Sequence, residues 1–188
     1  MKKVVLVLVF IFISISVYLY FQKEEYYIPK PKAMLKMDLP DNNFSIFSDD
    51  KIHFNVSNSA IVNQSDISYS ILYHDYESKI YFSVKNLDNL DLEIYNFENS
   101  ISVHEKQGAY IDANIIEDST ENIYGVLCYL EGSNIATSSQ FFITDSIQYF
   151  VRGGLEFSTS INPEIEVQND IMKQEVFKFI QSFKWSDK

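Results

Sequence analysis

The spacing of apolar residues changes period along this chain, and that change constrains its fold more than any other feature of the sequence. Residues 52–56 and 79–84 alternate apolar and polar side chains, as strands with one buried face do. From Leu90 to His104 the apolar side chains, and the histidine itself, recur every three or four positions, which places them on one face of a helix. A second helical stripe runs from Met172 to Phe183. The two stripes predict two amphipathic helices that pack on strands.

Three further apolar runs lie between the helical stripes, at residues 122–130, 136–144 and 147–157. Turn-forming residues separate these runs, Gly132 in the first gap and Asp145 in the second. Short turns between consecutive strands are typical of an antiparallel meander. The order of strands, helix, three strands and helix therefore predicts an α+β fold, a mainly antiparallel sheet with two amphipathic helices packed on it.

Finer expectations concern the ends of these elements. Residues 34–39 alternate and are expected to form a strand, whereas residues 41–50 are expected to form a loop. Side-chain oxygens cap helix N-termini, so we expect a cap from Asp88 or Asp91 on the first helix and from Asn169 or Asp170 on the second.

The N-terminal residues have the composition of a membrane anchor. Two lysines precede an uncharged run from Val4 to Phe21. As a helix this run would be roughly 27 Å long, close to a hydrocarbon core of about 30 Å. Lysines that precede such a run stay on the cytoplasmic side, so the rest of the chain is expected in the periplasm. No small-residue cleavage site follows the run, which favours an uncleaved signal anchor. We therefore expect an anchor over residues 1–21, a charged, proline-spaced stalk over residues 22–33 and a single globular domain over residues 34–188.

Charge and cysteine content exclude some partners and cofactors. The chain has 26 acidic and 15 basic residues, a formal net charge of −11, and that field would repel a phosphate backbone. Nucleic acid is therefore not an expected partner. The single cysteine, Cys128, excludes an intrachain disulfide and sulfur-rich metal sites. His53 and His74 lie in separate segments without metal-binding spacing, so neither a metal nor another cofactor is expected.

Cys128 and His104 are residue types that could form a nucleophile–base pair. Cys128 lies in the middle of an apolar run, where a buried and inert thiol is usual. His104 lies on the apolar stripe of the first helix, where a core histidine is the common finding. No nucleophile elbow, phosphate-binding loop or dinucleotide-binding motif occurs in the sequence. The chain is therefore expected not to be an enzyme.

Residues 140–157 hold most of the candidates for a structural or interaction motif. Thr144 and Asp145 begin the turn between two runs, where an aspartate can bond the backbone two residues on. Arg152 is the only arginine of the chain, and alternation places it on the same sheet face as Phe150. Across the hairpin it could meet Gln140 or a nearby carboxylate, and a buried or half-buried bidentate pair with a carboxylate would be structural. Arg152 could instead dock a partner protein. The candidate residues are Gln140, Thr144, Asp145, Phe150, Arg152 and His104.

Three blocks of this sequence resemble the gliding motility lipoprotein GldD family. The blocks are residues 32–40 (Lys-Ala-Met-Leu-Lys-Met-Asp-Leu-Pro), residues 140–153, which include Thr-Asp-Ser and Phe-Val-Arg-Gly, and residues 181–185 (Gln-Ser-Phe-Lys-Trp). Two features depart from the family pattern: the sequence has no N-terminal cysteine for a lipid, and Tyr149 stands where the family tends to have histidine. The closing helix also resembles the end of a Mog1/PsbP-type α/β/α sandwich, which is an analogy of fold alone.

The resemblance implies a non-enzymatic envelope component of bacterial gliding motility and of the associated type IX secretion machinery. Such a component acts through protein–protein interaction, so its expected partners are other gliding and secretion proteins of the envelope, and the membrane through the N-terminal anchor. A periplasmic ligand-binding or hydrolytic domain with a cleft near His104 and Arg152 is the alternative. A deep pocket that holds both side chains would favour the alternative, and packed surroundings without a cavity would exclude it.

Overall fold

The computed structural model describes residues 3, 13–15, 18, 39–40, 43–132, 137–160, 162 and 164–186. Its contacts divide the chain into two compact units, residues 1–37 and residues 38–188. The expected anchor lies mostly outside the described residues, as do the whole expected stalk and all but the last residue of the expected strand at residues 34–39. A search of the described residues for a helix long and apolar enough to cross a membrane finds none.

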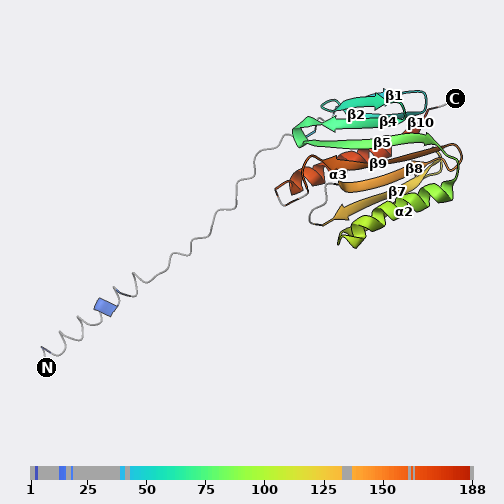
Figure 1. Ribbon diagram of the computed structural model, residues 1–188. Helices are drawn as coiled ribbons and strands as arrows, with labels where there is room; N and C mark the ends of the chain where they lie inside the picture. Colours follow the sequence, from blue (N-terminus) through green and yellow to red (C-terminus); the bar gives the residue numbers. More distant parts are fainter. Residues whose placement is uncertain are drawn as a thin grey trace. The chain divides into compact units, whose positions relative to one another are not determined.

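An antiparallel sheet of seven strands forms the centre of the second unit (Figure 1). The first and last strands in the sheet, β3 and β6, are its two edges. Every neighbouring pair in the sheet is antiparallel, in agreement with the predicted meander. In spatial order the strands are β3 (Ile61–Ser65), β4 (Ser68–Tyr73), β5 (Ser78–Asn86), β9 (Tyr149–Phe157), β8 (Thr137–Thr144), β7 (Ile123–Glu131) and β6 (Tyr110–Asp118).

A second, smaller sheet has three strands, β1 (Phe44–Ser48), β2 (Ile52–Ser57) and β10 (Lys184–Trp185), with β2 in the middle. The prediction of a loop over residues 41–50 is wrong for β1. Most of β1 is exposed, so burial leaves no alternating pattern in its sequence. Its extended backbone is fixed instead by antiparallel pairing with β2, which opposes Phe44 to Ser57 and Ser48 to His53.

The two predicted helices are present, and both expected capping positions are wrong. Helix α2 (Leu90–Lys106) is capped by Asn89, whose side chain accepts the backbone N–H of Leu92 at 3.0 Å. Helix α3 (Glu166–Ser182) begins a turn earlier than expected, after Ile165, and has no side-chain cap. Ile165, at the capping position, packs against the core instead. A one-turn 3-10 helix, η1 (His74–Tyr76), joins β4 to β5.

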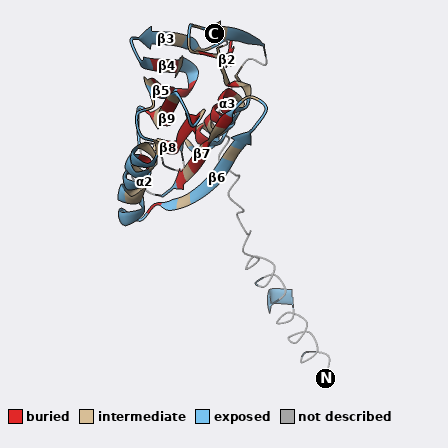
Figure 2. Cartoon of the chain, turned by 90° about the vertical axis from the view of Figure 1, so that its right-hand side faces the viewer, coloured by how far each residue is buried: buried red, intermediate tan, exposed pale blue. Residues whose placement is uncertain are grey.

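The helices lie on opposite faces of the large sheet, so the described domain has a layered α/β/α arrangement (Figure 2). Helix α2 contributes Phe97 to a smaller apolar cluster, the α2 cluster, which also holds Phe142 and Phe150. Helix α3 and the small sheet cover the other face, where the larger α3 cluster forms. Strand β9 contributes buried side chains to both faces of the sheet, because Phe150 belongs to the α2 cluster and the next residue, Val151, belongs to the α3 cluster. The predicted α+β fold class is confirmed.

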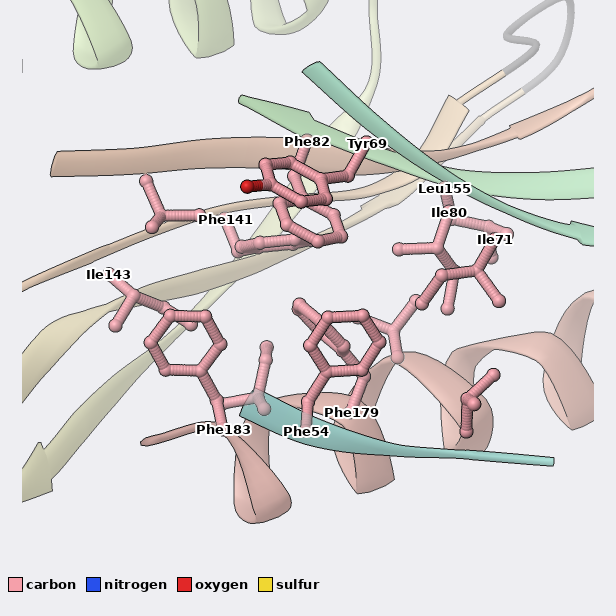
Figure 3. Packing of buried hydrophobic residues seen from close by; sticks show 14 of the residues in the cluster. Phe54, Tyr69, Ile71, Ile80, Phe82, Phe141, Ile143, Leu155, Phe179 and Phe183 are labelled. Carbon is pink, nitrogen blue, oxygen red and sulfur yellow. The ribbon is translucent and has the colours of Figure 1, made fainter. Parts of the chain in front are cut away.

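Aromatic side chains fill the α3 cluster (Figure 3). Phe179 of α3 and Phe54 of β2 lie 4.9 Å apart, measured between ring centroids, and Phe179 reaches Phe82 of the large sheet at 5.0 Å. These rings are oriented edge-on or tilted, which suits the charge distribution of aromatic rings. The small sheet, α3 and the large sheet are therefore packed around one aromatic core.

Asp49 connects the turn after β1 to the large sheet. Its Oδ1 atom accepts the backbone N–H groups of Lys51 and Ile52, at 2.8 and 2.9 Å. Its Oδ2 atom accepts a hydrogen bond from the hydroxyl of Tyr69 and another from Gln64 Nε2, the latter at 3.1 Å. Burial by itself would raise the pKa of Asp49, but the bonds from Tyr69 and the two backbone N–H groups outweigh burial and hold the pKa below its usual value.

The substitution Asp49→Asn is expected to lower the free energy of unfolding by about 1–2 kcal/mol at neutral pH, because a neutral amide cannot accept the same charge-assisted bonds. A carboxylate whose pKa is lower in the folded state stabilises the fold above its unfolded pKa, and that stability is lost as pH falls through the folded pKa. The difference between wild type and Asp49→Asn should therefore shrink below about pH 4. Urea melts at neutral and acidic pH measure it, with the exposed neighbour Asp50→Asn as control. A difference that persists unchanged in acid would contradict the assignment.

Candidate functional site

The candidate residues do not converge on one site. Thr144 and Asp145 lie at the turn between β8 and β9, and Phe150 lies inside the α2 cluster. His104 and Gln140 contact each other between α2 and β8, and Arg152 lies beside Phe97 of α2. Their contacts decide what each of them can do.

The turn between β8 and β9 is held by Asp145, as predicted from its sequence. Asp145 Oδ1 accepts three consecutive backbone N–H groups, those of residues 147–149, at 3.0, 2.8 and 2.9 Å. Thr144 Oγ1 donates to the carbonyl of Tyr149 at 2.7 Å and accepts the N–H of Ser146 at 2.9 Å. These bonds satisfy turn backbone groups that strand pairing leaves free, so Thr144 and Asp145 have a structural role.

Phe150 is fully buried and stacks on Phe142, with ring centroids 5.3 Å apart and planes 13° apart. The ammonium group of Lys85 lies 5.7 Å from the centroid of the Phe150 ring. Phe150 is therefore a core residue of the α2 cluster.

His104 is half-buried at the C-terminal end of α2, where it meets the sheet. The amide Nε2 of Gln140 lies 2.9 Å from His104 Nε2, and an amide nitrogen can only donate, so the imidazole nitrogen accepts. Gln140 in turn accepts from the hydroxyl of Ser100 through Oε1, at 3.4 Å. The other ring nitrogen, Nδ1, is buried and has no partner among the described residues. The nitrogen that would have to act as a base is thus already engaged, and no carboxylate orients the ring from Nδ1.

Cys128 lies close to this pair, because strand pairing places it opposite Gln140. Its side chain is buried, and burial raises the pKa of its thiol to about 11, with a smaller contribution from the charge of Asp112. A thiol with a raised pKa is a poor nucleophile at neutral pH. The register therefore brings a cysteine and a histidine into one neighbourhood without the electrostatics of a reactive pair.

Arg152 does not pair with a carboxylate in the part of the chain that the structure describes, so the expected half-buried ion pair is wrong there. Strand pairing opposes Arg152 to Phe142 and Ser83, and neither can neutralise a guanidinium. The guanidinium instead lies over the ring of Phe97, 5.8 Å from its centroid. Its partner is the π face of a ring on α2, which attracts a cation without a negative charge.

The substitution Arg152→Ala is expected to lower the free energy of unfolding by only about 0.5–2 kcal/mol, the range of a cation–π contact with its packing, because no buried carboxylate is left unpaired. A broken buried ion pair would cost about 3–5 kcal/mol instead. Urea denaturation of wild type and Arg152→Ala distinguishes the two ranges. Arg152→Lys, which keeps the cation, is the matched control. Its free energy of unfolding should lie between those of Arg152→Ala and wild type.

Three cavities are described, and neither His104 nor Arg152 lines any of them. A ligand-binding or hydrolytic domain would need a cleft at these two side chains. None of the three cavities is such a cleft. Within the described ranges no cluster of three or more histidine, cysteine, aspartate or glutamate side chains is arranged to hold a metal ion.

The largest of the three cavities is a groove of about 580 Å³ between the edge strand β6 and helix α3. This groove is called the β6–α3 groove below. Its apolar lining includes Ile116, Ile123, Leu127, Phe177, Ile180 and Phe183. Two residues of the lining are exposed, Phe177 by 48% and Ile115 by 84%. The structure thus exposes apolar side chains around one edge of the large sheet.

Acidic side chains surround this groove. The lining includes the carboxylates of Glu117, Asp118 and Glu121. A further carboxylate, that of Asp112, lies on strand β6. Glu121 is bound by Lys184 at 2.6 Å, but neither Asp112 nor Glu117 has a basic partner among the described residues. This surface was missed by sequence reasoning. The only local signal of this surface in the sequence was the pair Ile115-Ile116 between acidic residues. That β6 lies beside α3 depends on the tertiary fold.

Comparisons with known proteins agree with the architecture and identify the family. The solution structure of cyanobacterial PsbP (CyanoP) from Synechocystis sp. PCC 6803 is similar, with a TM-score of 0.51 and 12% sequence identity over 85% of this chain and 99% of that chain. At this identity the likeness concerns the fold alone, and it agrees with the predicted PsbP-like sandwich. No curated protein matches the chain. The family model for the gliding motility lipoprotein GldD matches residues 24–185, so the chain belongs to the GldD family.

Proposed function

We propose that this member of the gliding motility lipoprotein GldD family is a non-enzymatic component of the cell envelope that serves bacterial gliding and the associated type IX secretion machinery through contact with other proteins. The observation that carries the proposal is the family match over residues 24–185, which includes nearly the whole described domain. The family's name assigns it to gliding motility; the non-enzymatic role, the contact with other proteins and the link to secretion are our extension.

The contacts of the candidate residues support a role without catalysis. His104 is bonded to Gln140, Cys128 is a buried thiol with a raised pKa, and Arg152 lies on an aromatic ring. Catalytic groups normally meet in a pocket with the ionisation that their chemistry requires. Here the groups capable of chemistry are engaged in packing, and the exposed apolar groove lies elsewhere.

The proposal places the protein at a membrane of the envelope, in keeping with a lipoprotein family. We further propose that residues 1–21 are a signal anchor and that residues 34–188 form one globular domain in the periplasm. Support comes from the two lysines before the uncharged run and from the acidic, well-packed domain that follows. The one cysteine, Cys128, is buried in β7, so it does not offer a site for a lipid in the folded domain.

Deletion of the gene tests this function. The deletion strain is expected to lose colony spreading and to export less surface adhesin, and the wild-type gene supplied in trans should restore both. Colony diameter and adhesin on cells and in the medium are measured in the same strain. Normal spreading together with normal export in the deletion strain would refute the proposal. Loss of spreading with normal export would restrict the protein to motility.

A further inference from the structure

Strand β6 offers an unpaired edge to solvent. It has nine residues, Tyr110–Asp118, and pairs on one side with β7 in an uninterrupted antiparallel register. It is the last strand in the order of the large sheet, so its outer edge meets no other strand among the described residues. Most of β6 is exposed along its length (Figure 2). Natural sheets usually protect such an edge with proline, charged side chains or a bulge; β6 has no proline and no bulge, and its charged side chains are all acidic.

The β6–α3 groove runs beside this edge and provides an apolar surface next to the free backbone groups. A strand added to β6 would point every second side chain toward α3, where Phe177 and Ile180 line the groove. Phe177 is an exposed aromatic residue on a helix whose other face is buried in the core, so packing of the domain itself does not require it there. The edge and the groove together have the two elements of strand addition, backbone bonds for affinity and a pocket for side chains.

Charge indicates the chemistry of the occupant. Asp112 and Glu117 on β6 have no basic partner in the described part of the chain, and Asp118 lies beside them. Lysine or arginine on the face of an added strand that points away from α3 would neutralise Glu117, whereas a second copy of this chain would bring another net charge of −11 against the same surface.

We propose that β6 and the β6–α3 groove receive an extended segment of a partner protein as an added strand, and that this segment has basic side chains and at least one large apolar side chain. The inference rests on the proposed function, because it names the surface through which the envelope component contacts its neighbour. The apolar side chain, on the α3 face of the added strand, packs on Phe177, and the basic side chains, on its opposite face, pair with Glu117.

Hydrogen exchange of the detergent-solubilised full chain tests the binding mode, with a short synthetic peptide of alternating lysine and valine as the probe. The peptide is expected to slow exchange of the backbone amides of residues 110–118 by about tenfold or more and to leave α2 unchanged. The substitution Phe177→Lys should weaken peptide binding about tenfold or more, since it removes the apolar contact and adds a like charge. Tyr95→Lys on α2 is the matched control, because Tyr95 is also an exposed aromatic residue on a helix, and it should leave binding unchanged.

Several results would overturn the inference. They are absence of protection at residues 110–118, equal binding of a peptide of alternating glutamate and valine, and equal binding by Phe177→Lys and wild type. Protection of β6 that rises with protein concentration in the absence of peptide would mean that a second copy occupies the edge, and would also overturn it.

A strain assay separates this inference from the proposed function. A deletion strain that expresses Phe177→Lys at normal abundance is expected to lose spreading, and one that expresses Tyr95→Lys is expected to spread. If the deletion strain itself spreads and exports normally, the proposed function fails. If the deletion abolishes spreading and Phe177→Lys restores it fully, the docking surface alone is refuted.

Discussion

The substitution Phe179→Ala is expected to lower the free energy of unfolding by about 3–5 kcal/mol, because it removes a ring from the centre of the aromatic core. Phe179 is 2% exposed and belongs to α3, the element that covers one face of the large sheet. Its ring contacts four others, those of Phe54, Phe82, Phe141 and Phe183. Removing it would leave a cavity where the helix, the small sheet and the large sheet meet. A domain of this size is stable by only about 5–15 kcal/mol, so the truncation removes a large share of its stability.

The matched control for this truncation lies two residues away on the same helix. Phe177 is 48% exposed, so Phe177→Ala should change the free energy of unfolding by about 0.5 kcal/mol or less. Urea denaturation followed by circular dichroism measures both variants. Similar midpoints for Phe179→Ala and Phe177→Ala would mean that α3 does not pack as described.

The substitution Gly153→Ala is expected to lower the free energy of unfolding by about 3 kcal/mol, at the upper end of typical overpacking costs. Gly153 lies in β9 at the centre of the large sheet. A Cβ atom there would come within 2.4 Å of the carbonyl oxygen of Tyr81 and within 2.6 Å of both Phe141 and Phe82. The carbonyl oxygen belongs to the neighbouring strand, so relief of the clash requires the β5–β9 pairing to move. A pair of glycines in this stretch therefore serves close packing in the sheet.

Gly132 provides the comparison for this substitution. A Cβ atom at Gly132 would meet its nearest neighbour, the Cα atom of Ala109, at 3.3 Å, so a small adjustment accommodates it. Gly132→Ala should therefore destabilise the protein much less than Gly153→Ala, as measured by thermal melts of both. Equal melting temperatures for Gly153→Ala and wild type would contradict the packing of β9 against β5.

Elements with one buried face were predictable from the sequence. The helical stripes of α2 and α3 and the alternation in β2 and β5 reflect burial of one face, whereas β7, β8 and β9, which are buried on both faces, were predicted from apolar runs bounded by turn residues. Strand β4 alternates Tyr69, Ile71 and Tyr73 with less buried residues, so its signal was present and was missed. The edge strands β1, β3 and β6 are mostly exposed and keep no such alternation. Their extended backbone is determined by pairing with a neighbour, which a periodic pattern does not record.

The candidate site was predictable in its local parts and not in its tertiary ones. The turn role of Asp145 depends on the next few residues, and it is as predicted. The partner of Arg152 is Phe97 on a distant segment, and an aromatic ring was not the expected partner of the only arginine. The β6–α3 groove joins an edge strand to the last helix, so no short stretch of sequence contains it.

Colony spreading of a deletion strain that expresses the double variant His104→Gln, Cys128→Ala tests most directly whether the protein acts by contact and not by chemistry. The two substitutions remove the imidazole and the thiol that lie around Gln140, the groups nearest to a nucleophile–base pair. Immunoblots of membranes establish that the variant is as abundant as wild type. The account predicts spreading equal to that of the strain complemented with wild type. Loss of spreading by a variant of normal abundance would contradict it.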